Sequence, residues 1–312
     1  MHAAFLLDGK VVAEPRLLSG TVTHTDGSSS DGADITCLYD GATVEAFQNG
    51  ALLQIERDGT RLFTGYPDEI ETGLSGGGVQ LSLSARGFQA LLLDREAVRA
   101  EYSTARIDDL LRTYAAPAGV TRWDFGALPA LSGFTVESGT SFMQVFKNFA
   151  GWSKGWLPRF SADGTFIIQP FGHGGKTHSI DAGAPLLSVS RRVCPYGVIG
   201  SIELVENTTK KTFLVKDDAF YSAGIGTKEA MTFPRGKLEA YIGRARLRIA
   251  EAKRGYDCVS LRLAGAYPAE PGDVFSLSPH RGISGDYMAA TVQHTLSAGG
   301  YTTSAELIRR PD

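Results

Sequence analysis

Cysteine is scarce in this sequence of 312 residues, which contains only Cys37, Cys194 and Cys258. Three widely spaced cysteines cannot form the disulfide framework of a small secreted domain, and no Cys-x-x-Cys pair is present to hold zinc. We therefore expect three small buried thiols in a reducing compartment, with no metal or cofactor bound through them.

A surplus of positive charge is also lacking. Lysine and arginine total 31 against 34 acidic residues, and the formal net charge is −3. Acids and bases are interspersed along the chain, so the basic patch of a dedicated nucleic-acid binder is missing. We expect no sequence-specific nucleic-acid partner.

Long apolar runs are absent as well. No stretch approaches the roughly 18 apolar residues that would span a bilayer, so we expect no direct membrane insertion. The N-terminus has no charged leader, and its short apolar run stops at Asp8, which argues against a signal peptide. These features predict a protein that is made and folded in the cytoplasm.

Glycine, by contrast, is abundant, with 37 residues and no collagen-like period. Such a content indicates many tight turns, which a strand-rich protein needs. A hydrophobic fraction of 43% supplies enough apolar material for real cores. The length predicts two or three compact units.

Residues 1–95 have the pattern of strands joined by tight turns. Asp8-Gly9 and Asp58-Gly59 each separate two apolar runs, and each predicts a hairpin because both residue types tolerate positive φ. From Val79 to Ala85, apolar and polar residues alternate strictly, as in a half-buried strand. Evenly spaced strands of this kind predict a sandwich or a barrel.

Residues 96–185 change character. An apolar face with helical spacing predicts a helix that Pro117 halts, formed by Ile107, Leu110, Leu111 and Tyr114. A second helix is predicted to begin at Ser141, with Gln144 placed as in a capping box. Asp163-Gly164 predicts another hairpin. The middle part therefore reads as a small α/β module with an aromatic core.

Residues 186–312 return to strands around one long helix, which we expect from about Gly236 to Arg254 with Gly255 as its C-cap. Strands are predicted at 198–205, 212–215, 258–263, 273–277, 287–293 and 301–307. The predicted fold is mainly β with an α/β middle module. It comprises a tube-like antiparallel β-barrel domain (1–95), a small α/β domain (96–185) and a second tube-like β-barrel domain with one long helix (186–312).

Candidate sites for chemistry are weak. The stretch from Pro170 to Thr177 ends in Gly-Lys-Thr, but a phosphate-binding loop needs a glycine at Pro170 and a helix afterwards. We interpret it as a glycine-rich linker. The adjacent acids Asp108-Asp109 and Asp217-Asp218 point to different faces and form no carboxylate dyad.

The histidines are scattered and match no metal-binding spacing; they are His2, His24, His173, His178, His280 and His294. We expect His173 and His178 to be solvated in a flexible stretch. His294 is expected to be packed or hydrogen-bonded inside a barrel. No catalytic, cofactor-binding or metal-binding residue is predicted.

Short motifs follow one another in a definite order from about residue 60 to the C-terminus. Leu62 to Glu71 contains Phe-Thr-Gly-Tyr-Pro-Asp-Glu-Ile, and the predicted helix at Ser141 and the hairpin at Asp163-Gly164 come next. The end carries Pro-Gly-Asp (271–273), Gly-Asp-Tyr (285–287), Val-Gln-His-Thr-Leu (292–296) and Gly-Tyr-Thr-Thr (300–303). In this order the motifs resemble the phage late control D and baseplate hub superfamily, including hub proteins of Mu-like phages and of phage-derived bacteriocins. The first sixty residues match it only in layout.

The resemblance implies a structural baseplate hub subunit of a contractile phage tail or phage-tail-like particle, without enzymatic activity. Two tube-like barrels in each copy of a homotrimer would present six barrels, and so adapt the six-fold tail tube to the three-fold central spike around a central channel. The implied partners are the tail tube protein hexamer, the central spike protein, other baseplate proteins and the tape measure protein. The implied location is the tail baseplate of the virion or particle. Since the sequence ends at Asp312 without a lytic domain, we expect any peptidoglycan cutting in a partner.

Two alternatives stay open at this point. The chain could be a tail-associated peptidoglycan hydrolase, which a cleft gathering His, Glu and Asp would support. It could also be a glycan-binding or receptor-binding tail module, an idea suggested by Trp123, Trp152 and Trp156. Trp152 and Trp156 fit the core of the middle module equally well, and we prefer packing.

Overall fold

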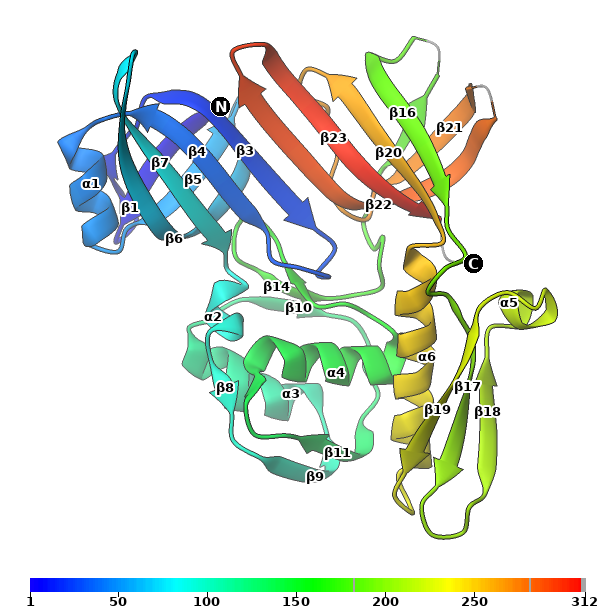
Figure 1. Cartoon of the computed structure of the whole chain (residues 1–312). Helices are drawn as coiled ribbons and strands as arrows, with labels where there is room; N and C mark the ends of the chain where they lie inside the picture. Colours follow the sequence, from blue (N-terminus) through cyan, green and yellow to red (C-terminus); the bar gives the residue numbers. More distant parts are fainter. Residues whose placement is uncertain (182, 281, 310–312) are drawn as a thin grey trace.

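The computed structural model describes residues 1–181, 183–280 and 282–309 (Figure 1). Strands dominate it, and thirteen of them belong to one large sheet. Eleven strands form a continuous path in the order β16-β20-β23-β22-β3-β4-β7-β6-β5-β1-β2, while β21 and β15 branch from β22. The mainly β fold that the sequence predicts is therefore confirmed.

The first half of this sheet comes from the N-terminal part of the chain. It contains β1 (His2–Leu7), β2 (Lys10–Ala13), β3 (Leu17–Thr25), β4 (Gly32–Leu38), β5 (Leu52–Arg57), β6 (Thr60–Ser75) and β7 (Gly78–Gly87). Both predicted Asp-Gly hairpins are confirmed: Asp8 and Gly9 have φ values of 50° and 75°, and Asp58 and Gly59 have 49° and 77°. The short helix α1 (Gly41–Gln48) covers the core of this half.

The second half comes mostly from the C-terminal part. It contains β15 (Thr177–Ile180), β16 (Leu186–Val193), β20 (Asp257–Ala264), β21 (Val274–His280), β22 (Ile283–Ser297) and β23 (Gly300–Arg309). These strands enclose a second apolar core, which includes Phe275, Tyr287 and Val292. The four strands that the sequence predicts after the long helix are all present.

The two halves are joined edge to edge. Strand β22 pairs antiparallel with β3 over six residues from Thr291↔Thr25 to Leu296↔Gly20. The sequence predicts two separate barrels, whereas the strand pairings in the described part of the chain close no barrel. Strands β3 and β22 pair with each other at this junction. Neither strand is therefore free to close a ring with the far strand of its own half.

A middle unit with its own aromatic core lies below the large sheet in the view of Figure 1. It contains α2 (Ala90–Leu93), β8 (Glu96–Ala97), β9 (Ala100–Ala105), α3 (Ile107–Leu110), β10 (Trp123–Phe125), β11 (Leu131–Val136), β12 (Thr140–Ser141), α4 (Phe142–Lys154), β13 (Arg159–Phe160) and β14 (Phe166–Ile168). The predicted N-cap of α4 is confirmed, because Ser141 Oγ accepts a hydrogen bond from the Gln144 amide at 3.2 Å. The helix at Ile107 was predicted to stop before Pro117; instead it continues as a π-helical turn and then a 3₁₀ turn that contains this proline.

A separate three-stranded sheet lies beside the middle unit (Figure 1). Its order is β18 (Thr212–Lys216), β17 (Ile199–Glu206) and β19 (Thr227–Phe233), and α6 (Leu238–Arg254) packs on one face. The short helix α5 (Asp218–Ser222) follows β18. A side chain at Gly243 would collide with the Trp152 carbonyl, so this glycine lets α6 cross α4 closely.

The turn between β3 and β4 fastens the large sheet to the parts below it. Asp26, which is 1% exposed, forms an ion pair with Arg254 of α6. Lys147 of α4 donates to the carbonyl of Ser28 at 3.1 Å.

The predicted domain boundaries at residues 95 and 185 stay a prediction. Within the described ranges, no helix combines the length and the apolar character needed to cross a bilayer.

Candidate functional site: the polar face of the large sheet

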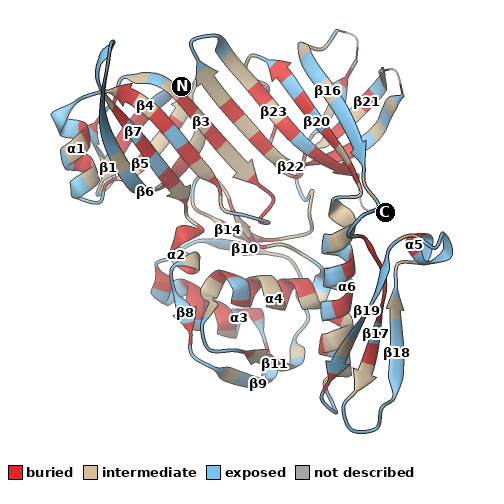
Figure 2. Ribbon diagram, viewed as in Figure 1, coloured by how far each residue is buried: buried red, intermediate tan, exposed pale blue. Residues whose placement is uncertain are grey.

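Eight neighbouring strands of the large sheet form an uninterrupted antiparallel run, β16-β20-β23-β22-β3-β4-β7-β6. Each half contributes four of them. Figure 2 shows buried and exposed residues alternating along these strands. One face of the run therefore packs on the two apolar cores. The other faces solvent over most of its length, except where Met288 and Ile308 are buried in a small apolar cluster with Phe171.

The solvent face consists largely of small hydroxyl side chains. One row crosses six adjacent strands through Thr302, Thr295, Thr21, Asp34, Ser84 and Glu69, each directly opposite the next. The neighbouring row crosses Ser188, Arg262, Ser304, Gln293 and Thr23. We call this surface the polar face. Large apolar side chains are missing from both rows, so these rows offer little apolar area for hydrophobic contacts.

The opposite residues along the same strands explain why this face is exposed. In the first half, Val22, Ile35 and Leu83 are at most 2% exposed, and each alternates with a residue of the polar face. In the second half, Val292 and Leu307 are fully buried. The period of two along each strand thus separates an apolar packing side from a hydrophilic open side.

Short side-chain contacts tie the acids of the polar face to their neighbours. Ser84 Oγ donates to Asp34 Oδ1 at 2.7 Å, and Ser260 Oγ donates to Glu306 Oε2 at 2.8 Å. These hydroxyl–carboxylate bonds link adjacent strands and hold the charged groups flat on the sheet.

The run of eight strands has an open edge at each end. Beyond Gly65, β6 pairs with β7 but no longer with β5, so one side of its distal half is free among the described strands. At the other end, β20 is the one partner of β16 among the strands that the structure describes. The two edges carry opposite charge: Glu69 and Glu71 on β6, and Arg192 on β16. Asp68 and Arg191 already form ion pairs within the chain, Asp68 with Arg86 at 2.7 Å and Arg191 with Asp257 at 2.8 Å.

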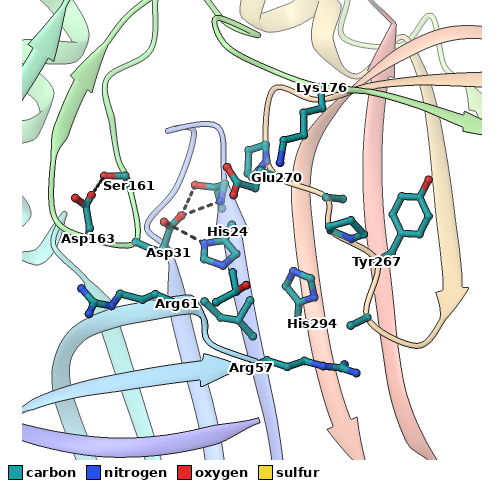
Figure 3. Close-up of a pocket in the computed structure, with 18 of the residues that line it drawn as sticks. His24, Asp31, Arg57, Arg61, Ser161, Asp163, Lys176, Tyr267, Glu270 and His294 are labelled. Atoms are coloured by element: carbon teal, nitrogen blue, oxygen red, sulfur yellow. Dashed lines mark hydrogen bonds and ion pairs between the residues drawn. The ribbon is translucent and has the colours of Figure 1, made fainter.

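A cleft of about 510 Å³ lies on the packed side of the same sheet (Figure 3). Strands β3 and β22 contribute His24 and His294, while the β13–β14 hairpin contributes Ser161 and Asp163. Arg57 reaches across from β5, and its guanidinium lies 3.8 Å above the centre of the Tyr301 ring. The cleft thus gathers acids and bases, which is the arrangement that the hydrolase alternative requires.

The contacts inside this cleft are those of turn residues. Asp31 Oδ1 accepts from the Thr25 amide at 2.8 Å, which closes the β3–β4 turn, and its other oxygen is 3.6 Å from His24 Nδ1. Ser161 donates to Asp163 within its own hairpin. Around the cleft, the described side chains therefore do not link a serine, a base and an acid in one chain.

His294 is buried as the sequence predicts, at 4% exposure. Its Nδ1 lies 3.4 Å from Thr303 Oγ1, and its ring contacts those of His24 and Tyr301. Burial lowers the pKa of this imidazole from its usual 6.5 to about 4, with smaller contributions from His24 and Arg57. The ring is therefore neutral near pH 7, as a packing residue should be.

Two other predictions about single residues were wrong in part. His178 was expected to be solvated, but its side chain is only 9% exposed and its Nε2 lies 2.7 Å from Asp273 Oδ2. Parallel pairing of β15 with β21 causes this, since it sets His178 opposite Phe275. Of the three cysteines, only Cys37 is buried, and burial raises the pKa of its thiol to about 11; Cys194 and Cys258 are half-buried.

Other candidate residues lie far from any common site. Strand β15, not a helix, follows the stretch from Pro170 to Thr177, in keeping with a linker. Asp108 and Asp109 occupy the first turn of α3, and Asp217 caps α5. Trp152 and Trp156 pack against the core of the middle unit, while Trp123 is 43% exposed. No group of three or more potential metal ligands occurs among the residues that the structure describes.

The polar face itself is the feature that the sequence analysis did not identify. Only one part of it had a readable pattern, the alternation from Val79 to Ala85. Other strands, such as β4 and β20, show a similar alternation, but their order in the sheet cannot be read from the sequence.

No family model matches the chain, and no curated protein matches it either. Solved structures do share its fold. The tail protein from Neisseria meningitidis MC58 matches with a TM-score of 0.79 and 15% identity, covering 98% of this chain and 96% of that one. The 43 kDa tail protein of prophage MuSo2 from Shewanella oneidensis matches with a TM-score of 0.72 and 14% identity, covering 99% and 98%.

A third similar structure comes from a secretion system. The E. coli c3393 protein is described as a component of the type VI secretion system with structural similarity to the T4 bacteriophage tail proteins gp27 and gp5. It matches with a TM-score of 0.62 and 9% identity, covering 96% of this chain and 74% of that one. At these identities the likeness establishes a shared fold.

Proposed function

We propose that this chain is a structural baseplate hub subunit of a contractile phage tail or phage-tail-like particle. It acts as a homotrimer that adapts the six-fold tail tube to the three-fold central spike and forms part of the central channel. The observation that carries the proposal is the eight-strand run with its polar face, built from two four-stranded halves that lie side by side. The fold shared with solved tail proteins over nearly their whole length supports it.

The two halves supply the symmetry. Each half offers four neighbouring strands with one hydrophilic face, and the β3–β22 pairing sets the halves next to each other within one chain. Three copies would repeat this junction around an axis and present six four-stranded units. In that assembly the halves become the two tube-like units of each subunit, and six matches the symmetry of a tail tube.

The open edges provide the way for three copies to close. An exposed edge strand exposes unpaired backbone groups and tends to pair with another strand. Here β16 exposes Leu187 and Val193, and the distal half of β6 exposes Leu74. The acidic edge of β6 and the basic edge of β16 attract each other, so we propose that β16 of one copy pairs with β6 of the next.

In the closed ring the polar face becomes the channel wall. Hydroxyl groups such as Thr21, Thr295 and Ser304 are small and uncharged, so DNA or an extended protein could slide past them. The acids of this face, Asp34 and Glu69 among them, repel phosphate and discourage retention of DNA. The partners in this proposal are the tail tube protein hexamer, the central spike protein, other baseplate proteins and the tape measure protein, at the tail baseplate. We propose no catalytic role.

Mass measurement tests the proposal. The purified chain should have three times the 33.3 kDa mass of one copy, and negative-stain images should show a ring. The double variant Glu69→Lys with Glu71→Lys should shift the mass toward one copy, because it places like charges at the edge junction. Adding Arg192→Glu should restore part of the trimer.

The matched control reverses two acids elsewhere in the same half. Glu14→Lys with Glu45→Lys changes the net charge equally, and both residues are exposed and lie outside strands β6 and β16. The control should keep the trimer mass. A wild-type chain that stays monomeric at micromolar concentration, or an edge variant that trimerises normally, overturns the proposal.

A further inference from the structure

The small sheet beside the middle unit has an exposed outer strand. Strand β18 pairs with β17 on one side, and no described strand pairs with it on the other. Below the large sheet, α6 lies between the middle unit and the small sheet, and β18 is on the side of the small sheet away from the middle unit (Figure 1). This edge is therefore separate from the ring edges β6 and β16.

The hydrogen-bond pattern identifies which backbone groups of β18 are free. The Glu206 amide donates to the Lys211 carbonyl at 2.9 Å, and the Asp217 amide donates to the Gly200 carbonyl at 3.1 Å. In an antiparallel pair, bonded and non-bonded residues alternate. With the printed register, Phe213 and Val215 also bond to β17. The amide and carbonyl groups of Thr212, Leu214 and Lys216 consequently point outward.

The side chains around these free groups are apolar at the centre and basic at the ends. Leu214 is 53% exposed and Phe213 is 38% exposed. Lys210 and Lys211 precede the strand, and Lys216 ends it. The strand has neither a proline nor a register shift, two devices that commonly protect an edge from pairing.

The lysines limit which strand can pair here. Lysine on an edge discourages pairing between identical copies, because each strand brings the same charge. The same lysines attract a strand of opposite sign. Lys216 already contacts Asp218 at 2.9 Å, which shows that a carboxylate fits at this end of the edge.

We propose that β18 is a docking strand that accepts an extended, acidic segment of a different protein by adding it to the small sheet. The segment forms backbone hydrogen bonds to Thr212, Leu214 and Lys216, and it places an apolar side chain against Leu214. Its carboxylates face Lys211 and Lys216. This interface lies outside the ring and goes beyond the proposed hub function.

A labelled synthetic peptide tests the proposal on the full chain. The probe is a fluorescent Thr-Glu-Val-Val-Val-Thr-Glu heptapeptide. Paired antiparallel to β18, it sets a valine opposite Leu214 and a glutamate opposite each of Lys211 and Lys216, which lie on opposite faces of the strand. Its comparison is the same peptide with lysine in place of glutamate. Fluorescence anisotropy should show binding of the acidic peptide that weakens as salt rises. The lysine peptide should bind at least tenfold more weakly.

Leu214→Pro is the decisive variant. It deletes an amide that points away from β17, so the internal ladder keeps all its bonds, and proline is tolerated in this position of an edge strand. The variant should bind the acidic peptide at least tenfold more weakly, while circular dichroism stays unchanged. The matched control Leu214→Thr keeps the amide and should retain binding to within about threefold.

A second variant covers the case in which proline disturbs the sheet. Lys211→Glu with Lys216→Glu should abolish binding of the acidic peptide and favour the lysine peptide. Absence of binding by the acidic peptide, equal binding of both peptides, or normal binding by Leu214→Pro overturns the proposal. The ring proposal is judged separately, since its edge variants change particle mass and the β18 variants should not.

Discussion

Asp273 should hold in place the segment that leads from the middle unit into strand β15 of the large sheet. Its carboxylate is 4% exposed and accepts three hydrogen bonds. The donors are the Lys176 amide at 2.7 Å, the Glu270 amide at 3.0 Å and, at 2.7 Å, His178 Nε2. One side chain thus ties strand β15 to the Pro-Gly-Asp turn before β21.

Replacing this residue by alanine removes the acceptor of two partly buried amide hydrogen bonds and of one imidazole hydrogen bond. A hydrogen bond to a charged group contributes about 1.5–3 kcal/mol, and a buried donor left unpaired adds a desolvation cost. Some of that loss is recovered when water enters or when the loop relaxes. We therefore expect the Asp273→Ala variant to lower the local opening free energy of β15 by about 3–4 kcal/mol.

Hydrogen exchange followed by mass spectrometry measures this opening directly. A loss of about 3 kcal/mol corresponds to roughly a hundredfold faster exchange at the protected amides of Thr177–Ile180. The control Asp181→Asn alters an exposed acid that accepts one bond, from the Gly183 amide at 2.8 Å, and should leave β15 unchanged. If Asp273→Ala and the control exchange alike, the carboxylate does not hold this connection.

Two further predictions concern His294 and the polar face. Because the folded-state pKa of His294 is about 4, below its usual 6.5, its contribution to the free energy of unfolding is complete above about pH 6.5 and is lost as pH falls toward 4. That loss amounts to about 3 kcal/mol, and urea unfolding at pH 4 to 7 should show it in the wild type and a flatter profile in His294→Phe. On the polar face, Thr21→Arg with Thr295→Arg places two cations directly opposite each other, at a stability cost of about 1 kcal/mol or less. The double arginine variant should retain DNA in a salt-dependent manner in an anisotropy assay, and Thr21→Asp with Thr295→Asp should not.

The parts of the fold that were predicted correctly depend on local chemistry. The Asp-Gly turns need positive φ at both residues, and aspartate and glycine are among the few residue types that adopt it readily. Ser141 caps α4 because its hydroxyl is the right distance from the Gln144 amide. The helix stripe from Leu238 to Arg254 likewise appears where its period indicated.

The missed elements show where local patterns compete. Asp40-Gly41 resembles a turn that ends a strand, yet Asp40 Oδ1 accepts from the Ala42 amide at 3.2 Å and starts α1. The same residue types serve both purposes, so sequence alone does not separate them. His178 was misjudged for a different reason: its burial depends on Phe275 and Asp273, which are almost a hundred residues away.

The polar face could not be derived from the sequence because it depends on strand order. Thr21 and Thr295 are both hydroxyl residues on half-buried strands, and nothing local says that they lie opposite each other. When β3 and β22 pair, the polar residues of one strand lie opposite the polar residues of the other. The hydroxyl groups of the two halves then form one continuous surface. A slip of one residue at this junction would turn one strand over relative to the other, so that either Val22 or Val292 would face outward and threonines would face a core. The apolar cores of the two halves therefore fix the register that aligns the proposed channel wall, so selection for packing on one side of the sheet also maintains the hydrophilic surface on the other.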